Sequence, residues 1–147
     1  MEEGPSFTHI VTVPDADIDE LGHANNVAYL RWVQDAAVAH SSAVGLGYEG
    51  YTALGGVFVI RRHEIDYLRS ALRGDRLLVR TRVSSVASAQ CERRTTVSRE
   101  SDGIELARAV TIWVYVDTKS GRPTRIHEAV YRAFGFEPRK KRSVTDA

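Results

Sequence analysis

The chain has little of several things that define common protein classes. Its 147 residues include one cysteine and four prolines, and its 20 Lys and Arg almost balance its 19 Asp and Glu. Because the lone Cys91 cannot form an internal disulfide, we expect a reducing compartment, and the cytoplasm by default. A formal net charge of +1 provides no strong field that would attract a polyanion, so we expect no nucleic-acid partner.

The chain also lacks a long hydrophobic run. The most apolar stretch, residues 53–60, contains two glycines and is far shorter than the roughly 20 residues that cross a bilayer. The first fourteen residues have no continuous apolar segment, so we expect neither a signal peptide nor a membrane partner. Hydrophobic residues make up 43% of the chain, which is enough for one domain with a single core, and we assign that domain to residues 1–138.

Sequence periodicity predicts strands on both sides of a long helix. Residues 7–13 alternate in polarity and end at Pro14, which is typical of a strand. Runs rich in β-branched and aromatic residues, separated by short turn sequences, predict four more strands at 57–68, 75–86, 90–99 and 105–116. A short turn of helix is expected within 45–56 and a short terminal helix at 126–134. We expect the basic tail, residues 139–147, to be disordered.

The longest predicted element is a helix over residues 26–44, capped by Asn25 or Asn26 and stopped by Gly45. Its residues at helical spacing are Val27, Leu30, Val33, Ala37, Ser41 and Val44. Numerous alanines along this helix allow a sheet to approach closely. One strand, one long helix and four successive strands predict an α+β fold, in which an antiparallel sheet packs on the helix. The sheet edges that remain open favour an oligomer.

The segment 15–26 contains the densest chemistry, with four acids, one histidine and two asparagines. As a calcium loop it fails at two positions, because Glu20 stands where glycine is needed and Asn26 where a bidentate Glu is needed. The five histidines are scattered along the chain without the spacing of zinc ligands. We therefore predict no metal site.

The same segment leads into the N-terminus of the long helix. Helix N-termini present unpaired N–H groups and a partial positive charge, which together stabilise an oxyanion. A carboxylate such as Asp19, facing that terminus across a bound carbonyl, could attack the carbonyl or activate a water. This arrangement suits acyl transfer to water. Asp, Gly and Asn are also ordinary loop and capping residues, so the residues alone leave a structural role open.

A longer motif extends from this loop into the helix and the later strands. It reads Asp17-x-Asp19-x-x-Gly22-His23-x-Asn25-Asn26-x-x-Tyr29-Leu30-x-Trp32, followed by Ile65-x-Tyr67 and Gly74-Asp75. This pattern resembles the hotdog-fold acyl-CoA thioesterases of the 4-hydroxybenzoyl-CoA thioesterase superfamily, nearest the long-chain acyl-CoA and plant acyl-carrier-protein thioesterase branches. The resemblance covers about residues 7–116.

The resemblance implies a fold, an assembly and a reaction. The fold would be a five- to six-stranded antiparallel sheet wrapped around one long helix. The assembly would be a homodimer or homotetramer with active sites at subunit interfaces. The reaction would be hydrolysis of an aliphatic or aryl acyl-CoA, or of an acyl group on a protein-bound pantetheine, without a cofactor.

The resemblance also assigns roles within the loop. Asp19 matches the catalytic carboxylate, as nucleophile or as general base. Asn26 stands where the helix begins, so its backbone N–H would bind the oxyanion. Gly22 permits a tight turn with positive φ. His23 has either a polar catalytic role or a loop-ordering one.

Substrate contacts are expected beyond the loop. Tyr29 is one candidate, although its spacing from Trp32 also suits packing in the core. Glu64 matches an acid that faces the substrate from the partner subunit in some hotdog enzymes, with a solvated or ion-paired role as the alternative. An acyl pocket would be bounded by Val33, Ala37, Val57, Val59 and residues 45–56.

Two residues and one turn depart from the family pattern. Leu21 replaces an asparagine of the acyl-carrier-protein branch, and Ser70 replaces a proline. The turn at 86–90 lacks the basic cluster that meets the coenzyme A phosphates in the hydroxybenzoyl-CoA enzymes. The nucleotide is then held elsewhere, with Arg93, Arg94 and the basic tail as candidates, or the carrier is a protein-bound pantetheine.

Two further functions fit the same fold. A hydratase or dehydratase acting on a carrier-bound acyl chain needs a histidine and an acid placed differently from Asp19 and His23. A non-catalytic module that binds or senses acyl-CoA would keep the pocket without turnover. Release of free coenzyme A separates these functions from hydrolysis.

Overall fold

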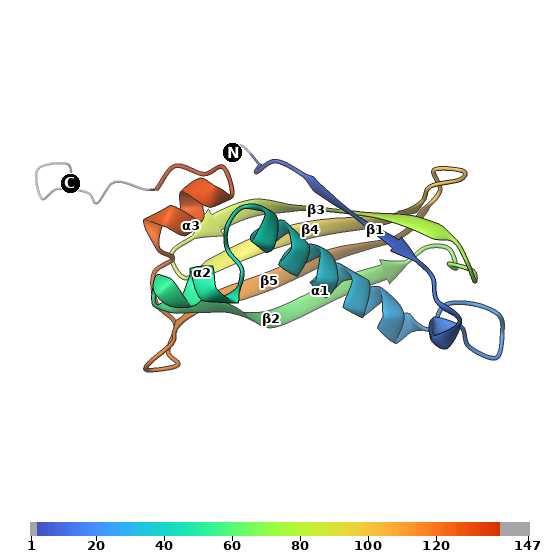
Figure 1. The fold of residues 1–147 in the computed structure, drawn as a ribbon, viewed down its shortest axis with the longest axis horizontal. Helices are drawn as coiled ribbons and strands as arrows, with labels where there is room; N and C mark the ends of the chain where they lie inside the picture. The colour runs from blue at the N-terminus through green and yellow to red at the C-terminus, as the bar shows by residue number, and fades with distance from the viewer. Residues whose placement is uncertain (1–2, 139–147) are drawn as a thin grey trace, which may run out of the picture.

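The computed structural model describes residues 3–138. Five antiparallel strands form one sheet in the order β1-β3-β4-β5-β2 (Figure 1). The strands are β1 (Phe7–Thr12), β2 (Gly56–Tyr67), β3 (Arg76–Ala87), β4 (Gln90–Arg99) and β5 (Glu105–Asp117). The basic segment 139–147, for which the sequence predicts disorder, lies outside the described residues.

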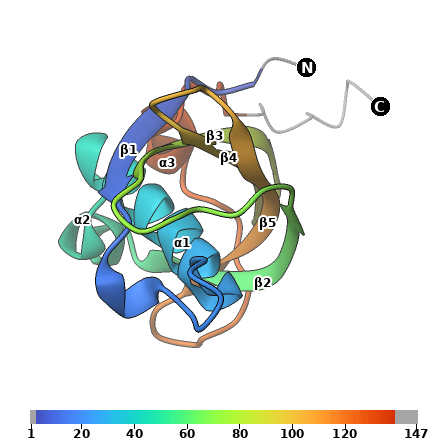
Figure 2. The same ribbon diagram turned by 90° about the vertical axis from the view of Figure 1, so that its right-hand side faces the viewer.

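One long helix lies on the concave face of this sheet. The helix is α1 (Asn26–Ala43), and the sheet curves around it when the molecule is viewed from the end (Figure 2). The shorter elements are the 3-10 turn η1 (Asp15–Asp17), α2 (Tyr48–Ala53) and α3 (Glu128–Ala133). This confirms the α+β hotdog architecture, with five strands. The predicted element bounds differ from the observed ones by one or two residues, and η1 was not predicted.

The buried face of α1 is rotated from the face that the spacing of its valines and leucines indicates. Val27 is 69% exposed, whereas Ala28 and Ala36 are fully buried. The core side of the helix consists of Ala28, Tyr29, Trp32, Val33, Ala36, Ala37 and His40. The two aromatic rings bury more apolar area than the aliphatic residues, and the alanines let the helix backbone approach the sheet.

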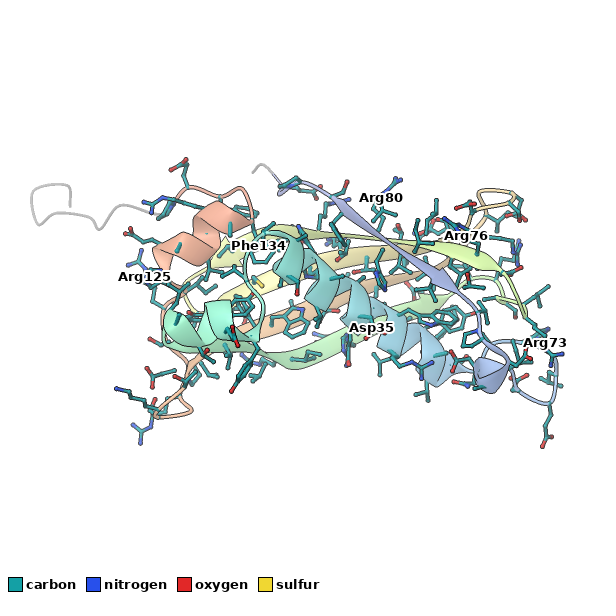
Figure 3. The ribbon with its side chains drawn as sticks, in the orientation of Figure 1. Asp35, Arg73, Arg76, Arg80, Arg125 and Phe134 are labelled. Atoms are coloured by element: carbon teal, nitrogen blue, oxygen red, sulfur yellow. The ribbon has the colours of Figure 1, made fainter. Side chains whose placement is uncertain are left out.

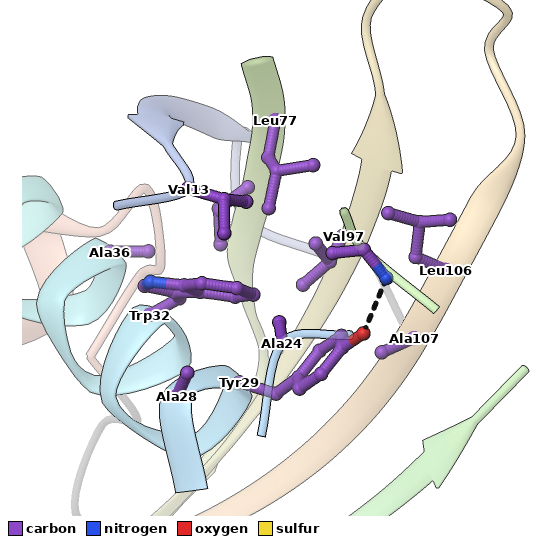
Figure 4. Packing of buried hydrophobic residues seen from close by; sticks show 12 residues of the cluster. Val13, Ala24, Ala28, Tyr29, Trp32, Ala36, Leu77, Val97, Leu106 and Ala107 are labelled. Carbon is purple, nitrogen blue, oxygen red and sulfur yellow. Dashed lines mark hydrogen bonds between the residues drawn. The ribbon is translucent and has the colours of Figure 1, made fainter. Parts of the chain in front are cut away.

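Tyr29 and Trp32 form the centre of the first core cluster (Figure 4). Their rings lie 5.0 Å apart, and both side chains are 2% exposed. The Tyr29 hydroxyl accepts a hydrogen bond from the N–H of Ala71 at 2.8 Å, so its polar end is satisfied inside the core. Tyr29 therefore fastens α1 to the segment between β2 and β3.

The strand order leaves β2 at one edge of the sheet and β1 at the other. Among the described residues, β2 pairs only with β5, and η1, α1 and α2 separate it from β1 along the sequence. The start of β2 lies tightly against β5, because a Cβ on Gly56 would stand 2.3 Å from the Tyr115 ring. Only glycine permits this approach, and β2 then runs for 12 residues as a free edge.

The core predicts unequal costs for two leucine truncations. Leu77 on β3 is fully buried, and Leu72 is 44% exposed. Leu77→Ala is expected to lower the free energy of unfolding by about 2–5 kcal/mol, since it leaves a cavity. Leu72→Ala is the matched control and should change it by no more than about 0.5 kcal/mol. Urea denaturation measures both, and equal effects would contradict this description of the core.

Candidate active site

Asp19 lies in a loop that closes on itself before α1 begins. Ile18 and Ala24 face each other in an antiparallel bridge, and the N–H of Asp19 donates to the carbonyl of His23 at 2.8 Å. The N–H of Asn25 donates to the carbonyl of Asp17, also at 2.8 Å. These bonds hold the loop at the N-terminal end of α1.

The Asp19 carboxylate is oriented by backbone amides of the same loop. Its Oδ1 atom accepts hydrogen bonds from the N–H groups of Leu21 at 2.9 Å and His23 at 3.1 Å. Gly22 permits the tight turn that brings these amides to the carboxylate, because it adopts a φ of +81°, which residues with a Cβ atom disfavour. Among the described residues, Oδ2 has no hydrogen-bond partner, and the side chain is exposed.

Asn25 connects the loop to the first turn of the helix. Its Oδ1 accepts a hydrogen bond from the N–H of Ala28 at 2.9 Å, and its Nδ2 donates to the carbonyl of Asp17 at 3.1 Å. Asn26 is the first helical residue. The N–H groups of Asn26 and Val27 therefore have no acceptor within the helix and remain available to an oxygen ligand.

An ion pair between the buried Asp17 and the half-exposed Arg31 holds the base of the loop. The Asp17 side chain is 8% exposed, and its Oδ1 lies 2.5 Å from Nη2 of Arg31 on α1. The other oxygen, Oδ2, is buried without a partner. Asp17 therefore orders the loop against the helix.

His23 and Asn26 are joined to the end of β2 and to the segment that follows it. The Nδ1 atom of His23 lies 3.3 Å from Oγ of Ser70, and the His23 backbone bridges to Leu72. The Tyr67 hydroxyl donates to the carbonyl of Asn26 at 3.4 Å. Sequence reasoning gave Ser70 no part in the site. The departure from proline at this position was the one available signal, because serine can bond a histidine and proline cannot.

Tyr29 is a packing residue in this chain. Its ring is buried against Trp32 and meets the Tyr67 ring edge-on at 5.3 Å. Burial raises the pKa of Tyr29 above its ordinary value, despite the hydrogen bond from Ala71. The hydroxyl is therefore neutral, and it is already bonded to Ala71 inside the core.

Glu64 and Arg94 lie together on the convex face of the sheet, away from α1. They line a hollow of about 410 Å³ that also includes Arg80, which Figure 3 labels on β3. Glu64 pairs with Arg62, and Arg94 pairs with Glu92 at 3.2 Å. Asp19, His23 and Asn26 do not line this hollow. The structure therefore does not bring these two residues to the loop within one chain.

Arg93 points to the opposite face of β4 and is 4% exposed. It lines a second hollow of about 250 Å³ between α1, α2 and the sheet. Ala37, Val57 and part of residues 45–56 line it, as the sequence analysis expects for an acyl pocket, but Val33 and Val59 do not. Because Arg93 is buried, it does not suit contact with the phosphates of a solvated nucleotide. It also faces the opposite side of β4 from Arg94, so the two side chains cannot bind the same phosphate.

The site at Asp19 is open on one side within a single chain. Neither hollow includes Asp19 or His23, and the exposed Asp19 carboxylate lies on the surface of the single chain. Over residues 3–138, no three His, Cys, Asp or Glu side chains gather where they could hold a metal ion. No helix in that range is long and apolar enough to span a membrane.

An exposed carboxylate in the loop before free helix amides is an arrangement suited to acyl transfer. Comparison with known proteins places the chain in a family. Residues 13–134 match the model of the thioesterase-like superfamily. The chain belongs to the thioesterase-like superfamily. The match covers the loop, α1 and all strands except β1.

Individual relatives of this thioesterase-like protein are distant. The chloroplastic acyl-acyl carrier protein thioesterase ATL2 of Arabidopsis thaliana is 25% identical over 123 residues, which are 84% of this chain and 65% of that protein. The chain thus spans less than two thirds of that relative's length.

Solved structures show the same fold. The 1,4-dihydroxy-2-naphthoyl-CoA thioesterase Slr0204 of Synechocystis superposes with a TM-score of 0.81 at 22% identity, over 88% of this chain and 96% of that one. The hypothetical protein TT1821 of Thermus thermophilus gives 0.79 at 27% identity, over 88% and 95%. These likenesses support the hotdog fold.

The double role of Asn25 predicts a measurable cost when its side chain is removed. Asn25→Ala is expected to lower the free energy of unfolding by about 1–2 kcal/mol, since it removes the N-cap of α1. Asn25→Asp keeps the oxygen that accepts from Ala28 and should recover most of that loss. Urea denaturation tests both variants, and an Ala variant as stable as the native chain would show that the cap contributes nothing.

Proposed function

We propose that this member of the thioesterase-like superfamily hydrolyses an acyl-CoA to a free acid and coenzyme A. The observation that supports the proposal best is the Asp19 carboxylate, held by two loop amides at the N-terminus of α1, where the N–H groups of Asn26 and Val27 have no acceptor within the helix. An acyl group on a carrier protein is the second candidate substrate. The similarity to a plant acyl-acyl carrier protein thioesterase favours it.

The proposed chemistry divides the work between the loop and the helix. The thioester carbonyl oxygen would lie against the N–H of Asn26, where the helix dipole and the free amide stabilise the negative charge of the tetrahedral intermediate. Asp19 would act through Oδ2, because Oδ1 is already bonded to the loop. It would either attack the carbonyl carbon or remove a proton from the attacking water.

Both routes end in the same products. As the carbon–sulfur bond breaks, the electron pair leaves with the thiolate of coenzyme A, which then takes a proton. If Asp19 is the nucleophile, a water hydrolyses the acyl–aspartate anhydride in a second step. If Asp19 is the general base, the acid forms in one addition and elimination. His23, joined to Ser70, would stabilise the loop or relay a proton.

A second copy of the chain would complete the site. Asp19 is exposed in the single chain, so an enclosed site would need surface from another chain. The free edge of β2 offers a pairing surface, and its Val59 is 44% exposed. We propose that β2 edges of two protomers pair into a continuous sheet and that the partner encloses the loop, in a dimer or tetramer. Glu64 on β2 would then be a substrate contact from the partner, as the resemblance implies.

The convex face offers a place for the nucleotide. Arg80, Arg82, Arg94 and Arg108 line the hollow there together with acidic residues. Arg94 therefore stays a candidate for the coenzyme A phosphates, whereas a carrier-bound pantetheine would need no such contact.

Asp19→Asn should abolish hydrolysis without unfolding the loop. The asparagine oxygen can still accept from Leu21 and His23, but the amide is neither a nucleophile nor a base. We expect kcat to fall about 100-fold or more on any active acyl-CoA. Free coenzyme A, detected with a thiol reagent over a panel of acyl-CoA chain lengths, measures the rate.

Asp15→Asn is the matched control, because Asp15 is an exposed aspartate of the same segment that pairs with Arg73. It should retain most of the native rate. An Asp19→Asn variant with native activity would contradict the assigned role. Tight binding of acyl-CoA without release of coenzyme A, in the native protein, would instead favour a non-catalytic module.

Charge at the β2 edge should separate the protomers. Val59→Lys is expected to convert the oligomer to monomer and to lower hydrolysis in parallel, since two lysines would meet at the paired edge. Ile10→Lys, on the opposite edge strand and of similar exposure at 47%, is the control. Light scattering after size exclusion gives the mass. A native monomer, or a Val59→Lys dimer, would contradict the proposed interface.

A further inference from the structure

The cavity beside the C-terminal half of α1 contains a buried positive charge without a negative partner. Arg93 is 4% exposed, and its side chain lines the cavity. Among the described residues that line the cavity, none is aspartate or glutamate. A guanidinium keeps its charge at all physiological pH values, and burying an uncompensated charge is costly.

The protein partners of Arg93 are neutral and use only one of its nitrogens. Nη1 lies 2.8 Å from Nδ1 of His40 and 3.1 Å from Oγ1 of Thr81. The guanidinium carbon lies 5.4 Å from the centre of the Phe134 ring, which Figure 3 labels beside α3. Within residues 3–138, Nε and Nη2 have no hydrogen-bond acceptor. Two donors on one side of the planar group are therefore free.

The other groups of the cavity do not supply the missing charge. Burial raises the pKa of Cys91 to about 12 and that of Tyr51 to about 12, so the thiol and the phenol stay protonated at neutral pH. Burial and the charge of Arg93 lower the pKa of His40 to about 4, so its ring is neutral and can accept from Arg93. Arg93 is the single charged residue among the lining residues described.

The shape of the cavity fits a small amphipathic ligand. Val38 and Tyr48 at its rim are strongly exposed, whereas Val83 and Cys91 are buried with Arg93 at its base. The cavity volume is about 250 Å³. An apolar cavity of about 150 Å³ holds benzene in an engineered protein, so there is room here for a ring or a short alkyl chain and one polar group.

We propose that this cavity binds a small carboxylic acid, with its carboxylate on the free N–H groups of Arg93 and its apolar part toward the rim. A carboxylate accepts two parallel hydrogen bonds from a guanidinium, which is the strongest pairing available to Arg93. The hydroxyl pair of Ser41 and Tyr51, 3.0 Å apart, lies in the same cavity and offers a further donor.

The site is distinct from the proposed hydrolytic loop. Asn26 and Ala37 are separated along α1 by roughly 16 Å, at 1.5 Å per residue. The acid could be a free molecule, such as a product or an effector. It could also be the distal carboxylate of an acyl group whose thioester end lies at the proposed hydrolytic loop with Asp19. Only this second case depends on the proposed function.

Calorimetry on the native protein tests the carboxylate directly. Hexanoate, benzoate and phenylacetate are titrated beside hexan-1-ol, benzyl alcohol and 2-phenylethanol, which have the same carbon skeletons. We expect at least one acid to bind about tenfold or more tightly than its alcohol, because only the acid pairs with the charge. Failure of every acid to bind, or equal affinity for acid and alcohol, would overturn the proposal.

Variants on β4 locate the site. Arg93→Met keeps the length of the side chain but removes the charge and should abolish the preference for acids. Arg94→Met is the control for acid binding, because it removes an arginine from the convex face of the same strand. Unchanged acid affinity in Arg93→Met would overturn the proposal, and the native acid-against-alcohol comparison decides the question if that variant does not fold.

A kinetic arm distinguishes the two sources of the carboxylate. Adipoyl-CoA and hexanoyl-CoA are compared as substrates of the native chain and of Arg93→Met. A rise in KM for adipoyl-CoA alone would assign the carboxylate to the substrate, and unchanged kinetics with lost acid binding would assign it to a free acid. If no acyl-CoA of the chain-length panel is hydrolysed, the proposed function fails, while calorimetry still judges the acid site.

Discussion

The bonds of Asn25 determine how the loop with Asp19 sits on α1. One side chain caps the helix through Ala28 and holds the loop through the carbonyl of Asp17. Because the Asn25 side chain bonds the N–H of Ala28, the N–H groups of Asn26 and Val27 stay free at the helix terminus. The loop that precedes them holds the Asp19 carboxylate in a fixed orientation. The backbone bonds of the loop and the pair between Asp17 and Arg31 reinforce that connection, so the acid and the free amides keep a defined relation.

The two halves of α1 present different chemistry to their surroundings. The N-terminal half begins at free N–H groups and follows the loop that carries the exposed Asp19 carboxylate. The C-terminal half covers a cavity that is apolar apart from Arg93 and a few hydroxyl groups. Since Trp32 and Ala36 are buried on the core side of the helix between them, the two regions are separate within one chain.

Several features of the fold follow from signals that are local in the sequence. The strand before Pro14 and the helix before Gly45 end within one residue of the predicted positions, and Gly22 has the positive φ that a tight turn needs. The buried face of α1 was predicted less well. Apolar residues occur around most of this helix, so periodicity alone did not distinguish the side of Val27 from the side of Ala28, and the packing of the sheet decided between them.

By itself, the sequence determined the order of the elements and the chemistry of the loop, because caps, turns and carboxylate–amide bonds join residues a few positions apart. Tertiary structure decided which side of each strand meets the helix, and so why Arg93 is buried against His40 while Arg94 faces outward. It also placed Ser70 at His23 and β2 at a free edge. These relations join residues distant in sequence, so they depend on how the whole sheet packs.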